Sequence, residues 1–503
     1  MKQRVLLDSQ NFCKLPCRKI QLRLFFHLVI PFSFSPLDYR PALYHMIVHA
    51  AEIYKKLRRN YMNYSLAKKF TFGSLMMFAL PTTVMMIFTS LYTIIDGVFV
   101  SRFVGTNALS SINIVYPAIN IVLGIAVMFS TGSCAIIAKK MGEGKPGNAR
   151  AAFTSIVYLN ILVGAVTAIL GNLFAEPLVR LLGASDLLMS DCMTYMRWQM
   201  AFAPALMLQI LFQMYFITEG RPGLGLFLTV LAGISNAVLD YVLIVPLKLG
   251  VTGAAIATVT GYMIPAVFGL IYFAVSRRAL WLVSPRLSAA ELKETLINGS
   301  SEMVTNLSSG IITFLFNLLM MHYAGEDGVA AITIIQYSQF LLNALYMGFS
   351  QGVSPVISYN YGSRNTKQLK QVFNTSFLFT GVTSILVFLT AQLGGGIIVT
   401  IFAHPGTAVY DLARHGFMVF AFGYLFSGVN IFSSALFTAL SNGKVSAVIS
   451  FVRTLCLIVL CLLFLPLIMG LNGVWLAVPA AEAGGFILCL YFLKRHAKTY
   501  GYR

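Results

Sequence analysis

Long apolar runs recur from residue 74 onward, and they restrict the fold more than any other feature. Twelve such runs, separated by polar stretches, lie at 74–100, 110–137, 151–175, 193–217, 223–247, 251–276, 297–321, 330–357, 373–402, 416–440, 445–469 and 474–493. A helix needs about 20 apolar residues to cross the hydrocarbon of a bilayer, and it satisfies its own backbone hydrogen bonds there. The sequence therefore predicts an all-α integral membrane protein with twelve transmembrane helices.

The composition argues against several other classes of protein. Hydrophobic residues make up 58% of the 503 residues and charged residues only 11%, whereas a soluble chain is about one-quarter charged. The net charge of +19 does not indicate nucleic acid, because the basic residues form short clusters between apolar runs, as in cytoplasmic loops. The seven cysteines lack metal-ligand spacing, so we expect neither disulfides nor a zinc site. We also find no phosphate-binding loop and no nucleophile elbow, and we expect no enzyme and no cofactor.

The basic residues predict how the chain is oriented in the membrane. If successive loops alternate between two sides, one side receives most lysines and arginines, including those of 139–150, 277–293 and the C-terminal tail. The loops of the other side receive only Arg102, Arg180, Lys248 and Arg414. Because basic loops stay in the cytoplasm, we expect a multi-pass protein of the cytoplasmic (plasma) membrane with both termini in the cytoplasm.

The two halves of the chain repeat with an offset of about 220 residues. The segment YVLIVPLKLGVTGAAIAT at 241–258 aligns with CLLFLPLIMGLNGVWLAV at 461–478, and Gly142 falls on Gly362. Each half holds six predicted spans, an even number, so both halves enter the membrane from the same side. The repeats are therefore expected to be parallel, and transporters often place their sites between such repeats.

The repeat divides the chain into an N-terminal extension at 1–61, an N-lobe at 62–286 and a C-lobe at 287–503. The extension matches nothing in the twelve-span plan. If the arginine pair of RRNYM (58–62) is encoded AGGAGG, it forms a ribosome-binding sequence just upstream of Met62. We therefore expect translation to begin at Met62. A signal peptide with LRLFFHLVIPF as its apolar core remains the alternative.

A small set of polar residues lies inside predicted spans of the N-lobe. Asp96 in the first span, Asp240 in the fifth and Thr258 in the sixth each lie roughly 6–12 Å below the outer surface, at 1.5 Å per residue. Asn236 shares the helix face of Asp240 one turn deeper, and Ala254 lies one turn from Thr258. A carboxylate in hydrocarbon costs several kcal/mol, so this grouping requires an explanation.

The polar set does not recur in the C-lobe, where the counterparts of Asp240 and Thr258 are Leu460 and Val478. A feature needed only to build the bundle would have recurred, so we interpret the set as a functional site. The alternative is a hydrogen-bonded cluster that only joins helices. Two neighbouring carboxylates cannot both be ionised cheaply, and hard oxygen ligands suit Na⁺ or H⁺. The two acids, the amide and the hydroxyl are thus the predicted cation site, a metal site if the ion is Na⁺.

Three further charged residues lie inside predicted spans of the C-lobe. Glu302 lies near the cytoplasmic end of the seventh span, at a shallow depth where its carboxylate can face water. Glu482, in the twelfth span, either binds a cationic substrate or pairs with a neighbouring polar group. Arg453, in the eleventh, either reaches the surface through its long stem or forms a structural ion pair, and we favour the ion pair.

These spans resemble the multidrug and toxic compound extrusion (MATE) family. The resemblance is carried by Pro81 and Asp96 in the first span, by NAVLD at 236–240 and by GVTGAAIAT at 250–258. The segment MGFSQGVSPVISYNYG at 347–362 is similar to the MepA-type branch of that family. The resemblance extends from about residue 66 to residue 494.

The resemblance implies a V-shaped pair of six-helix lobes around a central cavity. The family's cation site corresponds to Asp96, Asn236, Asp240, Thr258 and, through its backbone, Ala254. Pro81 matches the proline at which family members bend the first span. Glu302 lies in the seventh span, in which some members carry a functional glutamate, so the resemblance makes it a candidate for coupling. Some members carry an acid in the tenth span, but here Asp411 lies at or before the outer end of that span, so we expect no ion site of that kind.

We therefore expect a secondary active multidrug exporter that confers antibiotic resistance. It would exchange organic cations and other xenobiotics for Na⁺ or H⁺, acting as a monomer in the lipid bilayer without a nucleic-acid partner. One alternative is a flippase for lipid-linked polysaccharide or peptidoglycan precursors, which the scarcity of buried basic residues disfavours. A receptor or scaffold without transport is the other, and the two parallel repeats with one ion-type site disfavour it.

Overall fold

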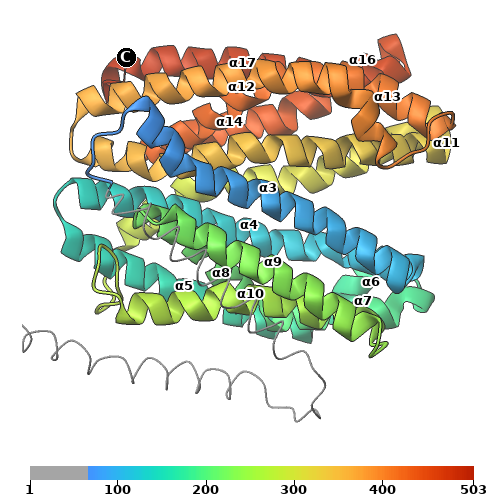
Figure 1. Ribbon diagram of the computed structural model, residues 1–503, viewed down its shortest axis with the longest axis horizontal. Coiled ribbons are helices and arrows are strands. Elements are labelled where there is room, and N and C mark those ends of the chain that lie inside the picture. The colour runs from blue at the N-terminus through green and yellow to red at the C-terminus, as the bar shows by residue number, and fades with distance from the viewer. Residues whose placement is uncertain (1–65, 503) are drawn as a thin grey trace, which may run out of the picture. The chain divides into compact units, whose positions relative to one another are not determined.

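The computed structural model describes residues 66–502, and the predicted extension at 1–61, the start at Met62 and the signal-peptide alternative lie outside them. Across the described residues the chain is helical and contains no strand (Figure 1). The helices are α3 (Phe72–Phe103), α4 (Thr106–Gly142), α5 (Pro146–Leu173), α6 (Ala175–Leu181), α7 (Asp186–Ala201), α8 (Ala203–Thr218), α9 (Pro222–Ile244), α10 (Gly250–Val275), α11 (Ala289–Gly362), α12 (Thr366–Thr400), α13 (Ala408–Phe420), η2 (Ala421–Gly423), α14 (Tyr424–Ala439), α15 (Gly443–Phe451), η3 (Val452–Leu457), α16 (Ile458–Met469) and α17 (Leu471–Tyr500).

The helix lengths account for twelve crossings of a membrane. Within 66–502, ten helical segments are long and apolar enough to cross, and α7 with α8, which meet at a bend of 53°, forms an eleventh. Helix α11 has 74 residues, about 110 Å at 1.5 Å per residue, far more than the hydrocarbon thickness of about 30 Å. It therefore supplies two spans, which confirms the predicted number.

Helix α11 folds back on itself at Gly325. A methyl group on Gly132 of α4 would overlap the carbonyl oxygen of Thr295, and one on Gly142 would overlap that of Tyr359. Both ends of α11 therefore lie beside the same half of α4. The reversal occurs at Gly325, whose φ of 63° lies in the left-handed region that glycine adopts without strain. The loop predicted between 321 and 330 is thus reduced to a single non-helical residue.

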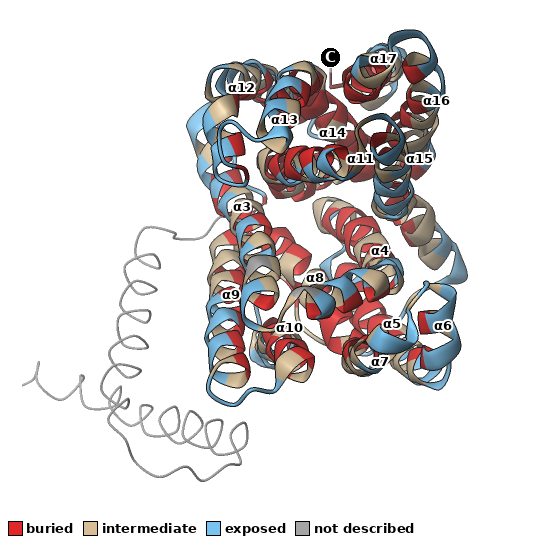
Figure 2. Cartoon of the chain, turned by 90° about the vertical axis from the view of Figure 1, so that its right-hand side faces the viewer, coloured by how far each residue is buried: buried red, intermediate tan, exposed pale blue. Residues whose placement is uncertain are grey.

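The helices fall into two groups that correspond to the predicted lobes. Figure 1 shows α4 to α10 on one side and α11 to α17 on the other, with α3 running along their boundary. Figure 2, viewed from the right-hand end of Figure 1, shows the same two groups, with buried residues on the helix faces inside each group. One apolar core, which includes Cys134, Ile217, Phe349 and Leu436, joins the two groups.

One end of the bundle carries most of the basic residues between helices. We call this the basic end and define it by the helix termini Phe72, Gly142, Gly362 and Tyr500. Lys139, Lys140, Lys145, Arg150, Arg221, Arg277, Arg278, Arg286, Lys293, Arg364, Lys367, Lys370, Lys444, Lys494, Arg495 and Lys498 lie at or near it. The basic loops predicted to share one side of the membrane are thus together in the structure.

The two lobes meet near the basic end through closely packed backbones. Residues at corresponding positions of the two repeats make these contacts. A methyl group on Gly299 would overlap the carbonyl oxygen of Met128, and one on Gly352 would lie 3.0 Å from the Cα of Ala79. Ala79 and Gly299 are separated by the 220-residue offset. The contacts between α4 and α11 and between α11 and α3 are therefore related by the repeat, as parallel repeats require. Small residues allow this close approach of helices in a membrane.

The segment between the lobes is fixed to the N-lobe. The guanidinium of Arg150 lies 3.3 Å from the centre of the Trp281 ring, and its Nε donates to the Ala279 carbonyl at 3.0 Å. The Val283 N–H donates to Thr154 Oγ1 at 3.0 Å. Helix α11 then begins with Ser288 as its cap. The predicted charged linker is therefore ordered along α5.

Candidate cation site

Helices α3 and α9 are the first and fifth spans, so they run in the same direction. Gly233 of α9 packs against Phe88 and Tyr92 of α3, where a methyl group would lie 2.6 Å from the Phe88 ring. Two turns further along α9 is Asp240, and a similar advance along α3 reaches Asp96. This register brings the two aspartates to one level.

Helix α10 runs in the opposite direction to α9 and packs closely on it. A methyl group on Gly253 would lie 3.1 Å from Cβ of Leu243, and one on Gly261 would lie 3.7 Å from Cβ of Asn236. Thr258 lies between these two contacts. It therefore reaches the level of the two aspartates, as the sequence predicts.

The carboxyl groups of Asp96 and Asp240 are hydrogen-bonding neighbours. Asp240 is only 2% exposed, and the Oδ1 atom of each aspartate is buried without a hydrogen-bond partner among the described residues. Two carboxyl groups can share a hydrogen bond only through a proton, and they cannot both be ionised cheaply. The free oxygen atoms therefore suit a proton or a small hard cation such as Na⁺.

The neutral members of the predicted set surround this pair in different ways. The Thr258 hydroxyl donates to the Ala254 carbonyl at 2.9 Å, which leaves the hydroxyl lone pairs free to accept. The Ala254 carbonyl thus orients Thr258. Asn236 is buried one turn along α9 from Asp240. The structure brings together the residues predicted for the cation site.

Four tyrosines around the aspartates were missed by the sequence reasoning: Tyr92, Tyr116, Tyr195 and Tyr262. The Tyr195 hydroxyl hydrogen-bonds to the side chain of Thr258, and it interacts electrostatically with Asp96 and Asp240. Tyr92 and Tyr262 interact with Asp96, and Tyr116 interacts with Tyr92. Tyr195 lies only two residues inside the predicted span at 193–217, so its position along the sequence gave no signal that it would reach the acidic pair.

Pro81 lies inside α3 on the side of the basic end. Because proline lacks an N–H, it removes one helical hydrogen bond and makes a bend inexpensive there. Its neighbours Ala79 and Thr82 pack against Gly352 of the C-lobe. Pro81 is about 22 Å along the helix from Asp96, at 1.5 Å per residue. The possible bend is therefore next to the lobe contact and remote from the acidic pair.

No group of three His, Cys, Asp or Glu side chains suited to a metal occurs within 66–502. The five cysteines of this part of the chain are free thiols. A sodium ion at the acidic pair would therefore be held by two carboxylates together with neutral oxygen atoms from residues such as Asn236 and Thr258.

The C-lobe holds a second buried polar cluster. Arg453 Nη1 lies 2.9 Å from Glu482 Oε1, and both side chains are less than a tenth exposed. Asn430 Nδ2 donates to Glu482 Oε2 at 2.6 Å and to the Glu482 carbonyl at 2.9 Å. Arg453 therefore forms the favoured ion pair, and the alternative that it reaches the surface is wrong. Both Glu482 oxygens have protein partners, so the structure favours pairing over substrate binding.

The remaining acidic candidates differ in their surroundings. Glu302 is half-buried and interacts electrostatically with Arg453. Asp411 lies in the first turn of α13 and is exposed. Its position agrees with the expectation that the tenth span carries no acid in its interior.

A family comparison identifies the chain. The model of the MatE family matches residues 81–242 and 303–463, which together are more than half of the sequence. The chain belongs to the MatE family. Its members are membrane transporters, not enzymes, with twelve transmembrane helices in two lobes. The two matched segments correspond to the two repeats, and each contains the core helices of one lobe.

Relatives and solved structures extend the match over most of the chain. The multidrug export protein MepA of Staphylococcus aureus (strain bovine RF122 / ET3-1) is 22% identical over 444 residues, 86% of this chain and 96% of MepA. A structure described as the outward-facing conformation of a multidrug resistance MATE family transporter has a TM-score of 0.81 at 21% identity, covering 86% of this chain and 97% of that one.

A third similar structure shows that proteins with this fold can differ in function. A transporter of the MOP superfamily from Pyrococcus furiosus Vc1 (DSM3638) also has a TM-score of 0.81, at 20% identity, with 86% of this chain and 97% of that chain covered. It is described as having a binding pocket of reverse polarity that suggests a different function. The shared fold therefore does not define the substrate, which depends on the residues of the individual chain.

Proposed function

We propose that the protein is a multidrug exporter of the plasma membrane, driven by Na⁺ or H⁺ that binds at Asp96 and Asp240. The observation that carries this proposal is the direct contact between the two carboxyl groups, whose buried Oδ1 atoms lack protein partners. Relatives named multidrug export protein support the choice of xenobiotic substrates. The basic loops support an orientation with the basic end in the cytoplasm.

The contacts between the lobes support a state that is closed at the basic end. The close backbone contacts of α4 with α11 lie at Met128, Gly132 and Gly142, in the half of α4 toward the basic end. Lys140 pairs with Glu291, and Lys139 lies 3.5 Å from Glu294. If the basic end faces the cytoplasm, this seam closes the path between the lobes on the cytoplasmic side.

In this proposal, binding of the cation changes the charge between α3 and α9. Occupation neutralises repulsion between the two aspartates, so the helices pack differently with and without the ion. Asp96 and the lobe contact near Pro81 are on the same helix, and a bend at Pro81 would transmit that difference to the seam. Each elementary charge moved through 100 mV provides about 2.3 kcal/mol for export. Substrate leaves as the cation enters.

The test is dye efflux from proteoliposomes with sodium and proton gradients imposed separately. We expect one gradient, or both, to drive efflux by the wild type, and Asp96→Asn and Asp240→Asn each to abolish it. Asp411→Asn is the matched control, because Asp411 is exposed on α13. Normal ion-driven efflux by both site variants at normal expression would disprove the cation role.

The flippase alternative finds less support. A site for a pyrophosphate-linked lipid requires basic groups facing the cavity, and the buried Arg453 is already paired with Glu482. We further propose that the protein acts as a monomer, since each chain would contain both lobes and a complete acidic pair.

A further inference from the structure

A cleft crosses the seam between the lobes at the basic end. It has a volume of about 550 Å³ and is lined from the N-lobe by Lys139, Gly142, Glu143 and Lys145, and from the C-lobe by Tyr361, Gly362, Ser363 and Arg364. A methyl group on Gly362 would overlap the Lys139 carbonyl oxygen, so the cleft lies where the two lobes touch. Any separation of the lobes at the basic end would divide its lining.

The lining of the cleft carries an excess of positive charge. It contains three cations and one carboxylate. Lys145 pairs with Glu143 at 3.0 Å, and Lys139 lies 3.5 Å from Glu294 outside the lining. Among the ion pairs of the described residues, none includes Arg364. The guanidinium of Arg364 is therefore available to a bound anion.

The backbone of Arg364 is strained. Its φ is +55°, in the left-handed region, and its counterpart in the other repeat, Gly144, has a φ of +73°. Both turns thus adopt the same kind of conformation, which glycine tolerates and an arginine does not favour. The ends of α8 and α14 show the same exchange, because Gly220 has a φ of +81° and Ser441 a φ of +59°. The conformation is thus a common way for a helix to end, and Arg364 differs from Ser441 in carrying a charge.

The charges of the cleft do not follow the repeat, although its backbone does. Gly142 and Gly362 correspond, but the counterparts of Lys139 and Lys145 are Tyr359 and Asn365. Packing requirements common to both lobes therefore do not explain the cations. They are specific to the one seam at which the lobes face each other.

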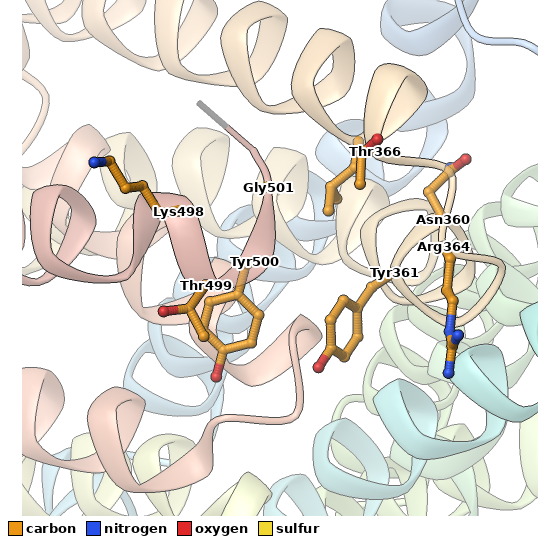
Figure 3. Close-up of a pocket in the computed structure, with 9 residues that line it drawn as sticks. Asn360, Tyr361, Arg364, Thr366, Lys498, Thr499, Tyr500 and Gly501 are labelled. Atoms are coloured by element: carbon orange, nitrogen blue, oxygen red, sulfur yellow. The ribbon is translucent and has the colours of Figure 1, made fainter.

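A smaller cavity of about 290 Å³ adjoins the cleft and shares Tyr361 and Arg364 with it. Lys498 and Tyr500 of α17 line its other side. In Figure 3 the guanidinium of Arg364 points away from Lys498 and Tyr500. Arg364 therefore belongs chemically to the larger cleft, and Lys498 provides a nearby cation that does not.

We propose that the seam cleft binds a phosphate-bearing anion and that the bound anion holds the basic end closed. Arginine and lysine groups recognise phosphate through charge-assisted hydrogen bonds. Because both lobes supply cations, the anion binds the closed arrangement more tightly than any arrangement with separated lobes. A ligand with such differential affinity shifts the population toward the closed basic end. The same chemistry is found in a soluble phosphate compound and in an anionic lipid headgroup.

The first experiment measures pyrophosphate binding to the purified full chain in nanodiscs of zwitterionic lipid by calorimetry. We expect Arg364→Gly and Lys145→Ala each to weaken binding by about tenfold or more. Arg364→Gly also relieves the strained φ, so a loss of binding cannot be attributed to misfolding. Lys498→Ala is the control and should bind as the wild type does. Unchanged affinity in Arg364→Gly would overturn the proposal.

A second arm identifies the source of the anion. Nanodiscs containing phosphatidylglycerol should compete with pyrophosphate if a headgroup reaches the cleft, and should leave its affinity unchanged if the ligand is soluble. Binding of neither pyrophosphate nor phosphatidylglycerol would overturn the proposal. These readouts do not require transport, so they stand apart from the outcome of the efflux experiment.

The clamping role is tested by distances between spin labels at Asn148 and Lys367, which are exposed on different lobes at the basic end. The labels are introduced in a background without the native cysteines. We expect pyrophosphate to increase the population with the short distance in the wild-type cleft and to have no effect in Arg364→Gly. Binding without any change in the distance distribution would refute the clamp.

Discussion

Glu482 on α17 pairs with Arg453 on the preceding span, and the Arg453 side chain leaves the helix from a π-helical turn at Val452–Leu457. Such turns are rare and often accompany function. Here the wider turn lies at the residue that carries the buried positive charge. The ion pair and the irregular helix are thus parts of one arrangement in the C-lobe.

Removing one partner of this pair should destabilise the protein strongly. Glu482→Gln removes the carboxylate that pairs directly with the buried Arg453 charge, and breaking a buried pair costs about 3–5 kcal/mol. We expect a large fall in the thermal unfolding temperature in detergent. The control is Glu176→Gln, because the Arg180–Glu176 pair is more than half exposed and contributes only a few tenths of a kcal/mol. Equal unfolding temperatures for Glu482→Gln and the wild type would contradict the argument.

The glycine contacts at the seam predict a shift in conformation. In Gly299→Ala the added methyl group would overlap the Met128 carbonyl, so the closed basic end becomes strained and an arrangement with separated lobes is favoured. Spin-label distances across the basic end should lengthen. Gly381→Ala on α12 has open space around it and should stabilise its helix by up to about 1 kcal/mol. Similar distances in the two variants would show that the contact does not control the seam.

The tyrosine next to the acidic pair predicts a graded effect on ion affinity. Tyr195→Phe removes the hydroxyl that bonds to Thr258 and interacts with both aspartates, but it leaves every carboxylate in place. We expect the ion concentration for half-maximal efflux to rise about three- to tenfold, with efflux retained, since a lost hydrogen bond costs about 1 kcal/mol. Tyr158→Phe, on an exposed position of α5, is the control. Complete loss of efflux in Tyr195→Phe would instead indicate an essential proton carrier.

A buried glutamate at the basic end predicts a dependence of stability on pH. Burial raises the pKa of Glu219, although its carboxylate accepts from the Tyr272 hydroxyl at 2.6 Å and from the backbone of Leu280. Between the ordinary pKa and the raised one, the folded state binds more protons than the unfolded state, so this contribution to stability is lost as pH rises. Glu219→Gln should flatten the fall in unfolding temperature with rising pH above about 4.5. An identical pH profile for both proteins would disprove the assignment.

The number of spans, their approximate positions and the level of the acidic pair were predictable from the sequence for simple physical reasons. Span lengths follow from apolar runs, and the depth of Asp96 and Asp240 follows from counting residues along rigid helices. The repeat was visible because packing requires small residues such as Gly142 and Gly362 at corresponding places. Span lengths and depths depend on single helices, and the repeat depends on a constant offset in the sequence. Neither requires knowledge of how the helices pack.

The tyrosines and the C-lobe ion pair were harder to predict because they depend on helix rotation. Tyr195 reaches Thr258 only after the bend of 53° between α7 and α8 sets its direction. The π-helical turn at Val452–Leu457 changes the phase of the helix, so counting along a regular helix cannot determine the direction in which Arg453 points. The polar residues between 321 and 330 suggested a loop, but α11 reverses its direction there at a single residue, Gly325.

The stacking of Arg150 on Trp281 has a mechanical consequence. Ala279, Val283 and Arg286 are all hydrogen-bonded to α5. A single residue, Leu287, separates the last of these bonds from the cap at Ser288. The N-lobe and the start of α11 are therefore rigidly connected, not joined by a flexible linker. A rotation of the N-lobe would therefore move the start of α11 with it. Glu291 and Glu294 lie there, and their pairs with Lys140 and Lys139 must break when the lobes separate.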